Sequence, residues 1–161
     1  MNLEYYNSDY DTLFGGLYII AILVILVLAI IGYFISALIY YTTSKINGFS
    51  DLAYIAWIPI LNVYSLFLLT ATIDEDSDPR PLAKRNTLIY FGLFIVSFVP
   101  VIGFIASLVM SGFVLYYSYR LIYRWTGETG KAVLYVILTF FTCGLFFAIY
   151  GLMRMNRPFK I

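Results

Sequence analysis

Four long stretches of the chain contain no Asp, Glu, Lys, Arg or His: residues 12–44, 52–73, 86–119 and 132–153. A helix needs roughly 20 apolar residues to cross the hydrocarbon core of a bilayer, and each stretch is at least that long. Only 12% of the residues are charged, whereas a soluble domain carries about 25%. Too little polar surface remains to cover a water-soluble fold, so the sequence predicts an all-α membrane protein with four hydrophobic segments.

The chain has 161 residues, a length that suits one domain. We therefore predict a single membrane domain over residues 1–161. Its predicted parts, in order, are an acidic polar leader at 1–12, segment one at 14–41, segment two at 52–72, a polar loop at 73–85, segment three at 86–122, segment four at 132–153 and a basic tail at 154–161.

The leader carries acidic residues and no Lys or Arg, whereas a signal peptide opens with positive charge. The apolar run that follows is also about twice as long as the apolar region of a signal peptide. We expect this first segment to remain in the mature protein.

The last three segments have helix-breaking or flexible residues at their midpoints: Pro59 and Asn62, then Pro100 and Gly103, then Gly144. Asn62, Gly103 and Gly144 are each 41 residues apart, and Trp57-Ile-Pro-Ile-Leu-Asn62 aligns with Phe98-Val-Pro-Val-Ile-Gly103. A fixed period indicates a repeated structural unit, and proline interrupts a helix. We predict that these five residues are hinges, either in kinked transmembrane helices or in re-entrant hairpins.

The placement of the ten basic residues separates these two arrangements, because Lys and Arg favour the cytoplasmic side. Four simple crossings leave at least four of the ten outside, whichever way the protein is turned. If only segment one crosses and the others dip in and return, all ten face the cytoplasm and the N-terminus lies outside. Re-entrant backbone must find hydrogen-bond partners in protein or water. Both arrangements stay open, and the charges favour hairpins.

No ionisable residue lies inside the segments, which argues against a proton-coupled transporter. The chain has one cysteine, Cys143, and no histidine, so neither a Cys-based metal site nor a catalytic triad is expected. A net charge of +1 gives no electrostatic case for nucleic acid. We predict no enzymatic activity, no cofactor and no metal.

The acidic cluster in the polar loop has the start of a calcium-site pattern. Asp74, Asp76 and Asp78 match the first three ligand positions of an EF-hand loop. Pro79 and Arg85 stand at the sixth and twelfth positions, where the loop requires Gly and Glu. We expect a solvated loop here.

Two groups of residues suggest contacts within the membrane. Gly103, Ser107 and Ser111 recur every four residues, which places them on one helix face, and such small-residue faces let membrane helices pack closely. They fit internal packing as well as association with another chain.

A second group lies in the aromatic stretch that ends segment three. Arg120, Arg124 and Trp125 are of the types found at headgroup depth, where cations meet lipid phosphates. We predict that these three residues contact lipid headgroups.

One motif is Trp57-Ile-Pro-Ile-Leu-Asn-Val-Tyr64. A second is Leu138-Thr-Phe-Phe-Thr-Cys-Gly-Leu-Phe-Phe-Ala-Ile-Tyr150, followed by the basic Arg154. With these two motifs the chain resembles small uncharacterised bacterial integral membrane proteins of the domain-of-unknown-function type. The resemblance covers roughly Ala53 to Arg157 and departs at Gly103, where Asn would stand. It implies the bacterial cytoplasmic membrane as location and carries no assigned activity or functional residue.

These observations favour a non-enzymatic protein that acts through helix packing against another membrane protein. It would be an accessory subunit of a transport or secretion complex, or an immunity-type partner of a membrane-active toxin. Two alternatives remain: a homo-oligomeric pore lined by the Ser, Thr, Asn and Tyr of the segments, and a membrane-shaping hairpin protein.

Overall fold

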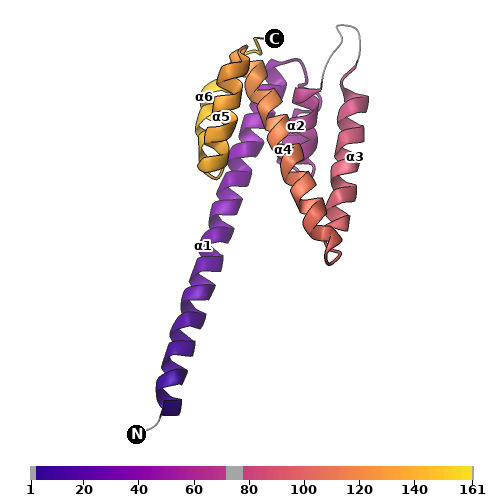
Figure 1. Cartoon of the computed structure of the whole chain (residues 1–161). Helices are drawn as coiled ribbons and strands as arrows, with labels where there is room; N and C mark the ends of the chain where they lie inside the picture. Colours follow the sequence, from indigo (N-terminus) through magenta and orange to yellow (C-terminus); the bar gives the residue numbers. More distant parts are fainter. Residues whose placement is uncertain (1–2, 72–77, 161) are drawn as a thin grey trace. The chain divides into compact units, whose positions relative to one another are not determined.

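The computed structural model describes the backbone of residues 3–71 and 78–160, and the side chains of residues 14–71 and 78–160. All regular structure in this part of the chain is helical. The residue contacts divide the chain into two units, Met1–Phe34 and Ile35–Ile161. Figure 1 shows the elements, which are α1 (Leu3–Ile46), the 3₁₀ helix η1 (Ala53–Trp57), α2 (Asn62–Thr70), α3 (Arg80–Val96), α4 (Ile102–Thr126), α5 (Thr129–Phe141) and α6 (Leu145–Arg154).

Helix α1 is one unbroken element of 44 residues. It runs through most of the predicted leader and five residues beyond the predicted end of segment one, because no proline interrupts its hydrogen-bond ladder. Between Phe14 and Phe34 almost every side chain is exposed, and the helix is apolar on all sides. The part Phe14–Ile46 is long and apolar enough to cross a membrane, and so is α4.

Each of the predicted segments two to four consists of two helical pieces joined by a short turn. Segment two contains η1 and α2, segment three contains α3 and α4, and segment four contains α5 and α6. Helix α3 begins at Arg80, inside the predicted polar loop. Pro81 sits in its first turn, where the missing N–H of proline has no helical partner to lose.

The turns between the paired pieces lie at residues 58–61, 97–101 and 142–144, and we call them tips 1, 2 and 3. Ile60 and Val101 have positive φ angles of 70° and 67°, and each directly follows a proline. Tip 3 has no proline; Cys143 and Gly144 reverse the chain with φ angles of 50° and 89°. Positive φ is costly for a β-branched residue, so tips 1 and 2 need the surrounding helices to hold them.

The predicted hinge residues all lie at or beside these tips. Pro59 and Pro100 are inside tips 1 and 2, and Gly144 ends tip 3. Asn62 is the first residue of α2, and Gly103 is in the first turn of α4. Their role as hinges stays a prediction.

The core of residues 35–161 is built largely from aromatic rings. Phe67 meets the rings of Phe113 and Tyr117 edge-on, at centroid distances of 5.7 and 4.7 Å. The buried amide of Asn86 on α3 donates a hydrogen bond of 2.9 Å to the Tyr117 hydroxyl on α4, which leaves neither polar group without a partner. Aromatic burial and this polar pair hold α2, α3 and α4 together.

A close helix crossing joins α6 to the last turns of α1. At Gly151 a Cβ atom would lie 2.6 Å from Cδ1 of Ile39. A side chain at position 151 would require the Ile39 side chain to move, so glycine permits the close approach of these two helices.

The glycine at tip 2 generates a prediction. A Cβ on Gly103 would lie 2.2 Å from the carbonyl oxygen of Ser97, a backbone atom that cannot swing aside. Gly103→Ala should lower the free energy of unfolding by about 1–3 kcal/mol, the usual cost of overpacking. Unfolding midpoints in detergent micelles, followed by circular dichroism, measure the change.

Gly112 in the same helix is the matched control, because nothing lies within 4 Å of its Cβ position. Gly112→Ala should leave the stability unchanged or raise it by up to about 1 kcal/mol through helix propensity. Equal effects of the two substitutions would show that the turn at tip 2 is not as tightly closed as the structure has it.

Candidate functional site: a basic end, apolar tips and open grooves

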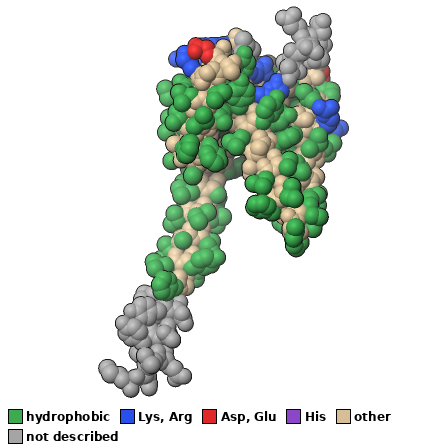
Figure 2. All heavy atoms as spheres, viewed as in Figure 1, with side chains coloured by type: hydrophobic (Ala, Val, Ile, Leu, Met, Phe, Trp, Pro, Cys, Tyr) green, Lys and Arg blue, Asp and Glu red, His purple; other side chains and the backbone are tan. Residues whose placement is uncertain are grey.

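The basic residues of the chain lie toward the helix ends opposite the tips or in the C-terminal tail. Those visible in Figure 2 gather on that side of residues 35–161. The paired helices run antiparallel, so the starts of α3 and α5 and the ends of α4 and α6 meet on one side. We call this side the basic end, and its members are Lys45, Arg80, Lys84, Arg85, Arg120, Arg124, Lys131, Arg154, Arg157 and Lys160.

Two arginines of the basic end bind carbonyl groups at the ends of other helices. The Arg124 guanidinium donates a hydrogen bond of 2.6 Å to the carbonyl of Leu69 in α2. Arg154, in the last turn of α6, donates to the carbonyl of Trp125 in α4. The last carbonyls of a helix have no partner within it, so these cations satisfy them and join three helices.

The C-terminal tail adds further bonds at the same place. The Lys160 ammonium donates to the carbonyl of Thr126 at 3.0 Å, and the Lys160 backbone N–H donates to the carbonyl of Arg124 at 2.9 Å. The backbone N–H of Phe159 donates to the side-chain oxygen of Asn47 at 2.8 Å, and the Arg124 guanidinium lies 4.3 Å from the centre of the Phe159 ring. The tail therefore ties the end of α4 to the turn after α1.

Two exposed ion pairs complete the basic end. Arg80 and Asp51 are 2.8 Å apart and link the start of α3 to the turn before η1. Lys131 and Glu128 are also 2.8 Å apart; their hydrogen bond lowers the pKa of the Glu128 carboxyl and raises the pKa of the Lys131 ammonium. Such exposed pairs stabilise a fold little. The first pair does bring the turn before η1 next to the start of α3.

The three tips are apolar and exposed. Ile60 in tip 1 is 64% exposed, Phe98 and Val101 in tip 2 are 75% and 83% exposed, and Phe141, the residue before tip 3, is 77% exposed. The tips contain no charged residue. Large exposed apolar surfaces are typical of contact with a partner or a membrane.

The backbone donors of tips 2 and 3 are largely satisfied within the tips. Around tip 2 the N–H groups of Ser97, Phe98, Val99, Ile102 and Gly103 all donate to nearby carbonyls, and Pro100 has no N–H. Around tip 3 the same holds for Thr142, Cys143, Gly144 and Leu145, and the Thr142 hydroxyl accepts from the N–H of Phe146 at 3.0 Å. Unsatisfied backbone groups are what makes non-helical chain costly in lipid, and few remain here.

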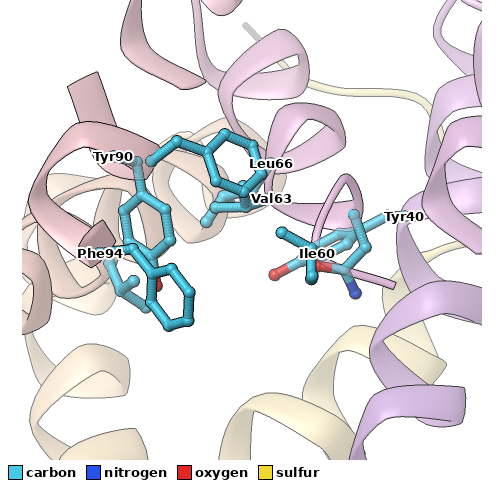
Figure 3. Close-up of a pocket in the computed structure, with 9 residues that line it drawn as sticks. Tyr40, Ile60, Val63, Leu66, Tyr90 and Phe94 are labelled. Carbon is cyan, nitrogen blue, oxygen red and sulfur yellow. The ribbon is translucent and has the colours of Figure 1, made fainter. Parts of the chain in front are cut away.

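Two connected grooves open beside tips 1 and 2. The first has a volume of about 320 Å³, and in Figure 3 Tyr90 and Phe94 of α3 face Ile60 and Tyr40 across it. The second has a volume of about 590 Å³ and lies between α3, α4 and α5. The two share Tyr90, Phe94 and Val114.

The predicted packing residues divide between these features. Gly103 is buried against Ser97 of its own helix pair. Ser107 and Ser111 are exposed and line the second groove, with Phe140 of α5 on its other side. The predicted face is therefore split, and its two serines pack against no neighbouring helix in the described part of the chain.

Of the predicted headgroup residues, Trp125 does not reach the surface. It is 1% exposed, because α6 covers that face of α4 and brings Phe147 and Tyr150 against the indole ring. The Arg124 guanidinium donates its hydrogen bond to the carbonyl of Leu69. The Arg120 guanidinium lies 5.9 Å from the centre of the Tyr116 ring at the basic end.

Sequence reasoning missed the bond between Asn47 and Phe159, whose partners are 112 residues apart, and the Lys160 contacts with the end of α4. No periodic pattern marks any of these residues. A signal existed only in Asn47-Gly48, a pair typical of a turn.

Asp74 and Asp76 of the acidic cluster lie outside the described residues, and the Asp78 carboxylate is 3.8 Å from the Arg80 guanidinium. Among the described residues no group of three metal-ligating side chains is close enough to hold an ion.

Comparison of the chain with protein-family models, with curated proteins and with solved structures gave no match. The fold itself defines the class: an all-helical chain with two helices long and apolar enough to span a membrane.

Proposed function

We propose that the protein is a non-enzymatic integral membrane protein in which α1 crosses the bilayer and the helix pairs enter it from the basic end as re-entrant hairpins. Helices α5 and α6 have 13 and 10 residues and rise about 20 and 15 Å, short of the hydrocarbon core of about 30 Å. Helix α4 differs from the core helix of a soluble protein, because only 22% of its apolar 18-residue stretch is buried.

The single observation that carries this topology is the hydrogen bonding of the basic end. Arg124, Arg154 and Lys160 bind carbonyls of neighbouring helix ends directly, so alternating crossings would have to break these bonds. Positive charge favours the cytoplasmic side, which puts the basic end there and the start of α1 outside. With the resemblance to bacterial membrane proteins, we assign the cytoplasmic membrane of a bacterium.

Thiol labelling in sealed vesicles tests the topology. Single cysteines replace the exposed Ser50, Thr129 and Asn156 in a Cys143→Ser background. An impermeant maleimide should label all three from the same face, because the basic end is one cluster. In the otherwise unchanged protein, Cys143 at tip 3 should react only after detergent is added, since lipid excludes the reagent. If Asn156→Cys and Ser50→Cys were labelled from opposite faces of the membrane, the hairpin topology would be wrong.

Within that topology, the protein acts by packing against another membrane protein, as an accessory subunit of a transport or secretion complex or as the partner of a membrane-active toxin. The groove of about 590 Å³ supports this role. Ser107 and Ser111 on its wall are small and exposed, and small residues allow a second helix to approach closely in lipid.

A larger side chain in the groove tests this role. Ser107→Phe should abolish co-purification of the partner after crosslinking in native membranes, because the ring occupies the space of the incoming helix. Val109→Phe is the matched control: Val109 is 46% exposed on the same helix and does not line the groove. Equal co-purification with both variants, or none with the unchanged protein, would contradict the packing role.

A second function is favoured by the α5–α6 pair, whose helices of 13 and 10 residues occupy mainly one leaflet if they enter from one side. Such asymmetric insertion bends a bilayer. Purified protein in liposomes should then narrow the vesicles or draw tubules, seen by electron microscopy.

Val101 at tip 2 offers the variants for this test. Val101→Asp introduces a residue type that tolerates positive φ better than valine does. It also adds a charge that costs about 2.5–3.5 kcal/mol at mid-membrane, so it should weaken the bending. Val101→Gly fits the turn without a charge and should retain it. Vesicles that stay unchanged with the unmodified protein would exclude membrane shaping.

A further inference from the structure

A third groove, which shares only Phe91 with the first groove and no lining residue with the second, runs between η1–α2 and α3. It has a volume of about 260 Å³. One wall is formed by Ile55, Leu61 and Tyr64, and the other by Lys84, Leu88 and Phe91. The residues of the second wall follow one face of α3, since they stand at i, i+4 and i+7.

The groove is charged at one end and apolar along its length. Lys84 lies in the second turn of α3, at the basic end, and its side chain is exposed. Leu88 and Phe91 lie about 6 and 10 Å further along the helix axis. Thr87, the remaining residue of this wall, donates its hydroxyl hydrogen to the carbonyl of Ala83 at 2.8 Å. Below Lys84 the wall therefore presents methyl, methylene and ring surface.

We propose that this groove binds an anionic phospholipid, with its phosphate at the Lys84 ammonium and one acyl chain along Leu88, Phe91 and Leu61. The inference rests on the proposed membrane insertion, which places the basic end at headgroup depth. A cation directly above an apolar groove matches a phosphate directly above an acyl chain. The phosphate of a phosphatidylcholine is balanced by its own choline, so an anionic lipid gains more from Lys84.

A diffuse attraction of anionic lipid to the whole basic end predicts the same preference for anionic lipid as a lipid bound in the groove. The two explanations differ only in where on the protein the lipid binds. A bound lipid depends on Lys84 and on the free space beside Leu88. A diffuse attraction depends on the number of charges and is indifferent to the groove. Lys131 supplies the comparison, because it is also an exposed lysine at the basic end and forms an ion pair with Glu128 outside the groove.

Native mass spectrometry of the full chain, released from bilayer discs of equal phosphatidylglycerol and phosphatidylcholine, measures the retained lipid. The unchanged protein should retain one phosphatidylglycerol. Lys84→Gln should lower this occupancy about fivefold, as expected for loss of one cation at an anionic surface, and Lys131→Gln should leave it nearly unchanged. Soluble glycerol phosphate should not compete, because it lacks the chain.

A second pair of variants tests the apolar part. Leu88→Trp fills the groove and should also lose the lipid, whereas Leu134→Trp, at an exposed position of α5, should keep it; Leu88 and Leu134 are 63% and 53% exposed, so neither change disturbs the core. Equal losses for Lys84→Gln and Lys131→Gln, unchanged binding by Leu88→Trp, or displacement by glycerol phosphate would each overturn the proposed site. The membrane insertion itself would survive that result, since the thiol labelling measures it independently.

Discussion

The bonds between cationic side chains and helix-end carbonyls at the basic end hold the helices of residues 35–161 in place. A helix leaves its last four carbonyls without partners. Arg124 reaches a carbonyl at the end of α2, whereas Arg154 and Lys160 both reach carbonyls at the end of α4. Threonine hydroxyls bind further carbonyls near the ends of α2 and α5. Because a cation also interacts favourably with the negative end of a helix dipole, one residue type serves both needs.

This concentration of charge at one end has a consequence for the other. With all ten basic residues gathered on one side, the opposite turns must reverse the chain without charged or exposed polar side chains. Proline removes a donor that would need a partner, and the positive φ of Ile60 and Val101 turns the chain within a few residues. The local hydrogen bonds at tips 2 and 3 then leave few free backbone groups. Such local bonding at tips 2 and 3 is what irregular backbone requires in the proposed membrane-inserted arrangement.

Much of the helical layout is predictable from the sequence because its causes are local. Charge-free runs predict the apolar helices, and the 41-residue spacing of Asn62, Gly103 and Gly144 coincides with the three breaks. The single-domain expectation stays a prediction, and the residue contacts divide the chain at residue 34. The burial of Trp125 and the bond between Asn47 and Phe159 depend on which helices meet across long stretches of chain. Amphipathic residues such as Trp suit both an interface and a core, so composition alone does not separate the two locations.

The grooves follow from the same geometry. The helices are held together at the basic end by hydrogen bonds, and at the other end their turns lie at different distances from it. They therefore cannot pack along their whole length. The core is dense around Phe67 and Trp125 near the basic end, whereas α3 and α4 continue past the shorter α2. Space therefore opens beside Tyr90 and Phe94. In a bilayer such space must be filled by lipid chains or by another helix, since water gains nothing there. In the proposed membrane arrangement, the helices of residues 35–161 are therefore complete only with whatever fills their grooves, which is the physical reason to look for the function there.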